Sequence, residues 1–242
     1  FVSLSKKMKA TKHIDCEHCE SRYKSIFCDL KGEHLASINE HKGCNMYKKG
    51  QTIFSEGFFP QGLFCINAGK VKVAQVGDNG REQIIRLTKD GDILGYRALL
   101  SGEKYSASAV ALEDCSVCLI PKDIFFKVIE SESSLSMQIM KLLSHDLGKA
   151  EHKITDLAQK PVRERMAEAI LFLKETYGTE SDGKTLMVSL SREEIANIVG
   201  TATETAIRLL SEFKSDLIIE LQAKKIKIIN YEKLLKTANI HD

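Results

Sequence analysis

The most reactive side chains in this chain are those of its seven cysteines, which are unevenly distributed along the sequence. Three lie near the amino terminus, two stand apart, and two lie together near the middle: Cys16, Cys19, Cys28, Cys44, Cys65, Cys115 and Cys118. In an intracellular protein, cysteines act as thiols, metal ligands or redox centres more often than as disulfides. We therefore expect free thiols, and the amino-terminal group is a candidate metal or redox site.

The amino-terminal cysteines leave more than one interpretation open. Two residues separate Cys16 from Cys19, and eight separate Cys19 from Cys28. His18 and His34 lie nearby, so zinc is one interpretation, although these spacings match no common zinc finger. A metal-free arm of thiols or inert cysteines is another, since free cysteine is among the most buried residue types. We interpret three further cysteines as core or spare thiols: Cys44, Cys65 and Cys115.

Composition bounds the class of protein. A chain of 242 residues, 43% hydrophobic and 28% charged, is long enough for two modest folded domains. No apolar run approaches the roughly 20 residues that span a bilayer, and residues 1–13 lack the apolar core of a secretory signal. We expect a cytoplasmic protein without a membrane partner, with Met8 as a candidate initiator.

Bulk charge says little about partners. The net charge is +2, and from Pro161 onward 12 Lys and Arg residues stand against 13 Asp and Glu residues. A nucleic-acid function must therefore come from a motif and not from general basicity. The chain has no nucleophile–histidine–acid arrangement and no phosphate-binding Gly-Lys-Ser/Thr loop, so we expect no enzyme activity.

Short apolar runs separated by glycines fill residues 49–121, a pattern typical of strands joined by tight turns. Many short strands at this spacing predict a barrel or roll. The predicted strands are residues 63–66, 71–74, 83–87 and 116–120, with a hairpin turn at residues 78–80. A short helix at residues 124–130 follows.

A long amphipathic helix is predicted at residues 135–157. One face repeats apolar residues at spacings of three and four, as in the seam of a two-stranded coiled coil. These residues are Met140, Leu143, Leu147, Ala150, Ile154 and Leu157, and a second edge has Leu135, Ile139 and Leu142. The helix is either a dimerisation helix or an ordinary helix buried in its own domain. Pro161 favours the first, because it ends the pattern where a second domain would begin.

Residues 189–213 predict a helix-turn-helix. Ser191 with Glu194 forms a capping box for the first helix, and we expect Thr201 with Glu204 to open the second. A plain helical hairpin in a core is the alternative. The two caps and the polar face of the second helix favour a DNA-binding unit.

Small and apolar residues of this segment fit that interpretation. Ala196 supplies a small residue where the two helices cross, and Gly200 supplies the turn. The second helix packs through Ala206, Leu209, Leu210 and Phe213. An amphipathic helix at residues 163–177 precedes the segment, and two strands at residues 217–221 and 226–229 follow it as a wing. The candidate DNA contacts are Ser191, Thr201, Thr203, Glu204, Ile207, Arg208, Lys224 and Lys225.

In this order, the elements resemble the CRP/FNR family of bacterial transcription regulators over nearly the whole chain. The matches are Lys49-Gly50-Gln51 with Ile53-Phe54, Gly69-Lys70-Val71, Gly91-Asp92, and Glu204-Thr205 with Arg208-Leu209-Leu210. The resemblance implies an α+β fold with four parts. The first two are a cysteine-bearing arm (residues 1–30) and a β-roll sensor domain (31–132), which is a jelly roll of the cyclic-nucleotide-binding type. The other two are a dimerisation helix (133–160) and a winged helix-turn-helix domain (161–242). The implied partners are a second copy, a palindromic operator in double-stranded DNA, and RNA polymerase.

The recognition helix of that family reads bases with a glutamate and an arginine, which match Glu204 and Arg208. Glu204 can accept a hydrogen bond from a cytosine amino group, and Arg208 can donate to both acceptors of guanine. Each such pair contributes about 1–3 kcal/mol of discrimination. Ile207 departs from the small or hydroxyl residue often found between them.

The chain departs from the cyclic-AMP-binding branch of the family. Members of that branch carry a glutamate for the ribose after the position of Gly95 and an Arg-Ser pair for the phosphate. This chain has Tyr96 and Tyr105-Ser106 at those positions. A buried phosphate would lack its paired charge there, so we do not expect cyclic AMP as the signal.

The cysteines resemble those of the FNR-type branch, whose members hold an iron–sulfur cluster with three cysteines on an amino-terminal arm and a fourth in the β-roll. The resemblance implies a [4Fe-4S] cluster with the ligands Cys16, Cys19, Cys28 and Cys118. The interval from Cys19 to Cys28 is longer than in the enterobacterial type. The implied function is a transcription regulator that senses oxygen, nitric oxide or redox state. The alternative is a regulator of the same fold that responds to haem or a small effector in the β-roll, or that needs no cofactor.

Overall fold

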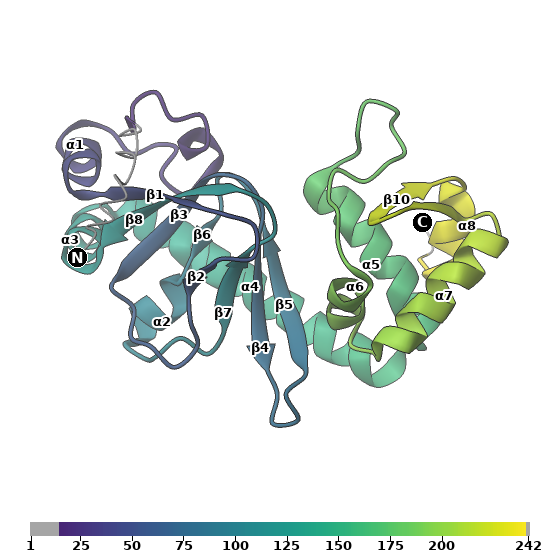
Figure 1. Ribbon diagram of the computed structural model, residues 1–242. Helices are drawn as coiled ribbons and strands as arrows, with labels where there is room; N and C mark the ends of the chain where they lie inside the picture. Colours follow the sequence, from purple (N-terminus) through teal and green to yellow (C-terminus); the bar gives the residue numbers. More distant parts are fainter. Residues whose placement is uncertain (1–14, 241–242) are drawn as a thin grey trace, which may run out of the picture.

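The computed structural model describes residues 15–240 as a β-sheet region and a helical region connected by one long helix (Figure 1). The expectations for residues 1–14, including Met8, lie outside the described residues. None of the helices in residues 15–240 combines the length and the hydropathy that a membrane span requires.

Two four-stranded antiparallel sheets form the β-roll, with the orders β1-β8-β3-β6 and β2-β7-β4-β5. The strands are β1 (Gly43–Tyr47), β2 (Thr52–Phe54), β3 (Gly62–Ala68), β4 (Val71–Val76), β5 (Glu82–Thr88), β6 (Ile93–Leu94), β7 (Ser108–Ala111) and β8 (Cys115–Pro121). The four predicted strands lie within β3, β4, β5 and β8, which confirms them. The predicted hairpin turn joins β4 to β5, and Gly80 adopts φ +74° in it.

Strands β7 and β8 differ in how many of their faces are covered by other elements. β7 alternates half-buried and buried residues, as expected of a strand with one face on a core. β8 is buried along almost its whole length, because helices α1 (Gly32–His41) and α3 (Lys122–Ser131) contact it as well. A strand covered on both faces can present buried side chains to each of them.

Short helices complete the roll. The 3-10 helix η1 (Arg22–Lys24) lies in the arm, α2 (Tyr96–Ser101) follows β6, and α3 confirms the helix predicted at residues 124–130. Ile124, Phe125 and Val128 are the buried residues of α3, at the spacing of one helical face.

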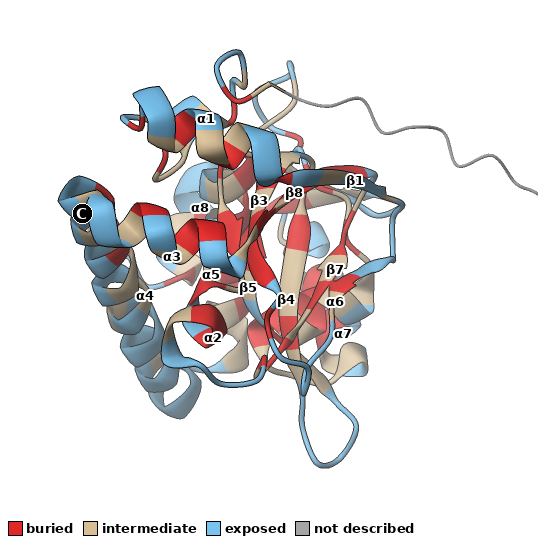
Figure 2. Ribbon diagram, turned by 90° about the vertical axis from the view of Figure 1, so that its left-hand side faces the viewer, coloured by how far each residue is buried: buried red, intermediate tan, exposed pale blue. Residues whose placement is uncertain are grey.

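The long helix α4 (Ser133–Gln159) confirms the helix predicted at residues 135–157. Leu135 and Ile139 are buried in the core of the roll, and Leu142 packs against it, as expected for the second apolar edge. Much of the rest of α4 is exposed (Figure 2). Pro161 ends the helical path, since α5 (Val162–Tyr177) begins directly after it.

The carboxy-terminal part is a winged helix-turn-helix. It contains α5, α6 (Arg192–Val199), α7 (Thr203–Ser215), β9 (Ile219–Gln222), β10 (Lys225–Ile228) and α8 (Tyr231–Thr237). The predicted packing residues of α7 are all buried. The wing begins later than predicted, because Leu217 has φ +55° and is 72% exposed, so it belongs to the turn before β9.

The capping of the two motif helices is partly as predicted. Ser191 and Glu194 form the expected capping box of α6. The predicted cap of α7 by Thr201 is wrong, because α7 has Ala202 at its N-cap position and no side-chain cap. The N–H of Thr201 instead donates to the carbonyl oxygen of Ala196 (3.1 Å), beside the N–H of Gly200 (2.9 Å). Thr201 therefore closes the end of α6 and does not open α7.

Candidate cysteine site and DNA-binding surface

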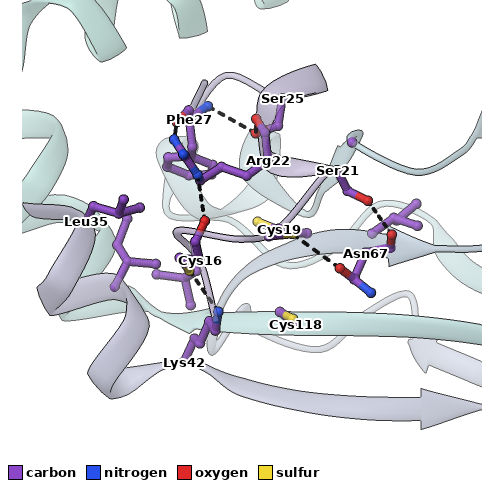
Figure 3. Close-up of a pocket in the computed structure, with 15 residues that line it drawn as sticks. Cys16, Cys19, Ser21, Arg22, Ser25, Phe27, Leu35, Lys42, Asn67 and Cys118 are labelled. Atoms are coloured by element: carbon purple, nitrogen blue, oxygen red, sulfur yellow. Dashed lines mark hydrogen bonds between the residues drawn. The ribbon is translucent and has the colours of Figure 1, made fainter. Parts of the chain in front are cut away.

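The amino-terminal arm is held against strand β3 by side-chain hydrogen bonds (Figure 3). The Cys19 thiol donates to Oδ1 of Asn67 (3.2 Å), and the Ser21 hydroxyl donates to the backbone oxygen of the same asparagine. The N–H of Cys16 donates to Oδ1 of Asn39 in α1 (2.9 Å). The arm is thus fixed at Cys16 and Cys19, the two cysteines nearest its start.

Arg22 fixes the internal shape of the arm. Its Nε donates to the carbonyl oxygen of Cys16 (2.7 Å). Its Nη1 donates to the carbonyl oxygens of Phe27 (3.0 Å), Cys28 (3.0 Å) and Leu30 (3.3 Å). A planar guanidinium with several donors is suited to binding several carbonyl groups at once. The turn that carries Cys28 is therefore held in a defined place.

Under the arm lies a cavity of about 50 Å³. Four cysteines line it, from the arm and from two neighbouring strands: Cys16, Cys19, Cys65 and Cys118. The buried Lys42 lines it too, and its Nζ donates to the Cys16 sulfur at 2.7 Å. Burial raises the pKa of the Cys16 thiol, and the Lys42 ammonium opposes that rise because it favours the thiolate.

The four predicted cluster ligands do not all lie at the cavity. Cys16, Cys19 and Cys118 meet at the cavity, whereas Cys28 is not among the residues that line it. Cys65 does line it, although we interpreted this residue from sequence as a core or spare thiol.

The expectation that all the cysteines are free thiols is wrong for one pair. Cys44 and Cys118 face each other in the register of β1 and β8 and are joined by a disulfide. Register between strands distant in sequence is not visible in a cysteine spacing, which is why the pair was missed. Cys118 can act as a metal ligand only after this bond is reduced.

The donors that the cavity offers are mainly sulfur atoms, which suit soft metal centres. Across the described part of the chain, no three His, Cys, Asp or Glu side chains stand in a geometry that would hold a single metal ion. His18 is 83% exposed and pairs with Asp15 (2.9 Å), and His34 faces Glu132 (3.5 Å). The cavity is lined by three free thiols, those of Cys16, Cys19 and Cys65, and by Cys118, whose sulfur is in the disulfide. Once Cys118 is reduced, four thiols would surround the cavity, and thiolates are the ligands that iron–sulfur clusters use.

The position where cyclic-AMP binders have their glutamate is occupied by a buried tyrosine. The Tyr96 hydroxyl hydrogen-bonds to the Asp146 carboxylate in α4, and Nη1 of Arg86 donates to the Tyr96 oxygen (2.5 Å). Arg86 also pairs with Asp146 (3.2 Å). Tyr96 therefore links the roll to the long helix.

The predicted dimer seam is largely open in the single chain. Leu147 is 62% exposed and Ile154 is 68% exposed. Met140, Ala150 and Leu157 are exposed as well, while Leu143 is half-buried against the core of the roll. A row of exposed large apolar residues on one helix is characteristic of an interaction surface.

The outward face of α7 carries the predicted base-reading residues. Glu204, Ile207 and Arg208 are exposed, and Thr201, Thr203 and Ser191 are half-buried. Arg208 pairs with Glu212 one turn further along the helix. On the wing, Lys224 and Lys225 are exposed, and Lys225 pairs with Glu180.

Sequence reasoning missed Arg192 at this surface. Its Nη2 donates to the carbonyl oxygen of Ala223 at the tip of the wing (3.0 Å), whereas Nη1 is buried without a protein partner. Arg192 therefore ties the start of α6 to the wing. A basic residue directly after the capping serine was the available signal.

A β-roll, a long connecting helix and a winged helix-turn-helix define a sensor-linked DNA-binding protein. Residues 45–132 match the model of the cyclic nucleotide-binding domain, and residues 164–237 match that of the Crp-like helix-turn-helix domain. This chain belongs to the CRP/FNR family of transcription regulators and is not an enzyme.

Several relatives align with the chain over most of its length. It is 31% identical to "Electron transport regulator A" of Shewanella oneidensis, over 91% of this chain and 89% of that protein. It is 29% identical to the "Fumarate and nitrate reduction regulatory protein" of Vibrio cholerae, over 94% and 91%. FixK2 from Bradyrhizobium japonicum has a similar fold, with a TM-score of 0.72 and 23% identity over 81% of this chain and 96% of that one.

Proposed function

We propose that this protein is a homodimeric, cytoplasmic transcription regulator that senses oxygen, nitric oxide or redox state through an iron–sulfur cluster. The observation that carries the proposal is the convergence of Cys16 and Cys19 of the arm with Cys118 of β8 on one cavity. The names of relatives agree with it, among them "Anaerobic regulatory protein" of Aggregatibacter actinomycetemcomitans. Such a cluster supplies a cross-link between arm and sheet that is sensitive to oxidants.

The residues around the cavity support binding of a negatively charged group. The thiolates of Cys16, Cys19 and Cys118 would bind iron, and the Lys42 ammonium would offset part of their charge. The Asn67 amide oxygen accepts from the Cys19 thiol. Once Cys19 is a thiolate, the amide would have to turn its N–H₂ group toward the sulfur to hydrogen-bond to it. From the sequence, Cys28 is the predicted fourth ligand.

The arm has a direct route to the long helix. Phe27 and Leu30 are buried in the same hydrophobic cluster as Leu135 and Ile139 of α4. Nε2 of Gln138 in α4 also donates to the Asp29 carboxylate (3.4 Å). Movement of the arm would therefore change the packing at the start of α4, the helix that carries the proposed dimer seam. A coupling of about 1–3 kcal/mol is enough for a useful switch.

In the DNA complex, the dimer would place two α7 helices one turn of DNA apart. Glu204, Ile207 and Arg208 would face base edges, with Thr203 beside them. Ser191, Thr201 and the wing residues Lys224 and Lys225 would contact phosphate. RNA polymerase would be the further partner of the bound dimer.

The first experiment is purification without air, followed by assays of iron and acid-labile sulfide and a visible spectrum recorded before and after air is admitted. We expect about four iron and four sulfide per chain, with a broad band that bleaches in air. The Cys118→Ala variant should lack both the iron and the band. Binding to a palindrome selected by the chain from random duplexes should be tighter without air.

Iron-free protein that binds the palindrome equally in both atmospheres would refute the sensor and leave the regulator standing. A haem spectrum, or a small effector that alters DNA affinity of the iron-free chain, would support the alternative signal in the β-roll. Failure of the full chain to select any palindrome would contradict the predicted operator.

A further inference from the structure

The carboxylate of Glu212 lies between two arginines at the recognition helix. Its Oε1 accepts from Nη1 of Arg208 (2.5 Å), and its Oε2 accepts from Nη1 of Arg163 (2.9 Å). The first bond joins residues one turn apart within α7, whereas the second connects α7 to the start of α5. Glu212 therefore connects the predicted base reader Arg208 to a neighbouring helix.

Arg163 is held in place by further contacts. Its Nη2 donates to Oδ2 of Asp216, the C-cap residue of α7 (2.6 Å). Its Cζ lies 4.8 Å from the centroid of the Phe213 ring, which is fully buried. An arginine that lies over an aromatic ring and bonds two carboxylates through its planar fork has little rotational freedom left. The Glu212 carboxylate is consequently anchored to the core of the domain.

The two ion pairs of Glu212 do little for folding. The Arg208 side chain is 64% exposed and that of Glu212 is 39% exposed, and ion pairs in contact with water have a small effect on stability. The relay from Arg163 through Glu212 to Arg208 is better explained by its effect on the last of these side chains.

Arg208 can bind a base while Glu212 holds it. A guanidinium has five N–H donors, and guanine needs only two of them for O6 and N7. A long side chain that moves freely before binding loses rotamer freedom when it docks, and a side chain that is already held loses less. A fixed carboxylate beside Arg208 would therefore reduce the entropic cost of reading guanine.

We propose that Glu212 is a positioning residue for base recognition, which orients the Arg208 guanidinium through its own anchor on Arg163. This inference rests on the proposed function, in which Arg208 reads a base. The negative charge of Glu212 also opposes attraction to phosphate, which is the source of non-specific affinity. Both effects increase the preference of the protein for its operator over other DNA.

The test measures this preference with Glu212→Gln, which keeps the side-chain volume and removes the charge. The full chain, purified without air, is titrated with the selected palindrome in competition with a duplex changed at one G·C pair per half-site. We expect the preference to fall about two- to tenfold, the cost of ordering one long side chain. The affinity for an unrelated duplex should stay equal or rise, because a negative charge near the phosphates is lost.

Two further proteins separate positioning from general charge and from structural damage. Glu175→Gln removes the same charge at an exposed position of α5 and should keep the wild-type preference. In the Arg208→Ala background, Glu212→Gln should have no further effect on the preference if it acts through Arg208. A merely structural role would lower the preference equally in both backgrounds. Because the preference is a ratio of two affinities in one preparation, a partly unfolded variant does not imitate the effect.

The outcomes distinguish the two claims. A chain that selects no palindrome, or Arg208→Ala with the wild-type preference, contradicts base reading by Arg208 and this inference with it. A loss of preference in Arg208→Ala but not in Glu212→Gln overturns only the role of Glu212. An equal effect of Glu212→Gln with and without Arg208, or an equal effect of Glu175→Gln, overturns that role as well.

Discussion

Lys153 of the long helix α4 donates through Nζ to the backbone oxygen of Ile198, near the end of α6, at a distance of 3.1 Å. The last four carbonyl groups of a helix have no partner within it. Here, the neighbouring carbonyls accept from Gln83 of β5 and Arg165 of α5, at Asn197 (2.6 Å), Val199 (3.2 Å) and Gly200 (3.2 Å). The position of α6 therefore depends on the roll, on α4 and on α5 together.

Replacement of Lys153 by Met should weaken the contact between α4 and α6. The Ile198 carbonyl would lose its charged donor, which contributes about 1 kcal/mol and corresponds to a fall of about 2–4 °C in Tm. DNA affinity should fall as well, since α6 supports the recognition helix. Thermal melting and a gel-shift titration measure the two effects. Lys149→Met, at an exposed position of the same helix, is the control, and equal behaviour of the two variants would contradict the role of Lys153.

The stability of the contact between the roll and α4 should depend on pH in the alkaline range, because Tyr96 contributes to that contact. Burial raises the pKa of Tyr96 to about 12, above the value of about 10 of a free tyrosine. The stability contributed by the neutral phenol is therefore present below pH 10 and is lost as pH rises through 12. The phenolate absorbance of the wild type minus that of Tyr96→Phe should titrate near pH 12. A midpoint near that of free tyrosine would show that Tyr96 is accessible and not bonded to Asp146.

Substitution of Gly91 tests whether docking of the arm protects the thiols of Cys16 and Cys19. A Cβ at this position would lie 2.8 Å from the Cβ of Lys24 and 3.1 Å from the Ser21 oxygen, and Gly91 has φ +91°. Gly91→Ala should therefore displace the arm and expose Cys16 and Cys19 to a chromogenic disulfide reagent.

Gly80→Ala is the control for this glycine substitution. Gly80 has φ +74°, so it carries a comparable backbone cost of about 1–2 kcal/mol. A Cβ there would meet nothing within 4 Å, so only the steric effect on the arm differs. Equal thiol reactivity in the two variants would mean that docking at Gly91 does not protect the cysteines.

The seam of α4 is tested by Leu147→Glu. A charge buried at the centre of the proposed interface should cost roughly 2–4 kcal/mol of dimer stability. We expect a monomer in analytical ultracentrifugation and much weaker binding to the palindrome, with the iron content unchanged. His152→Glu adds a charge at an exposed position away from the seam and should have little effect. A dimer that survives Leu147→Glu would place the interface elsewhere.

Arg208 is expected to read sequence. Arg208→Ala should lose about 1–3 kcal/mol of preference for the selected palindrome over a duplex changed at one G·C pair per half-site. Lys214→Ala, at an exposed position near the other end of α7, should change the affinity for both duplexes alike. Competition titrations at fixed salt measure the preference, and an unchanged preference in Arg208→Ala would exclude this residue as a base reader.

Elements governed by neighbours in the chain were predictable. The capping box of Ser191 and Glu194 joins residues three apart, and the turn ending at Gly80 needs only local backbone conformation. The buried face of α7 follows from helical periodicity. Helix α1 and the short elements β1, β6 and α2 were not predicted, because their positions depend on packing against the sheets and not on their own sequence pattern.

The arrangement of the cysteine site could not be read in the same way. Cys65 meets Cys118 because β3 pairs with β8, and Cys118 meets Cys44 because β1 pairs with β8. Likewise, Thr201 resembles a helix cap until the closing bond to Ala196 is seen. Residue types and local spacing therefore established the DNA-binding helices, the long apolar seam and the presence of a thiol-rich arm. The register of strands distant in sequence decided which thiols meet, because that register is set by the packing of the whole roll.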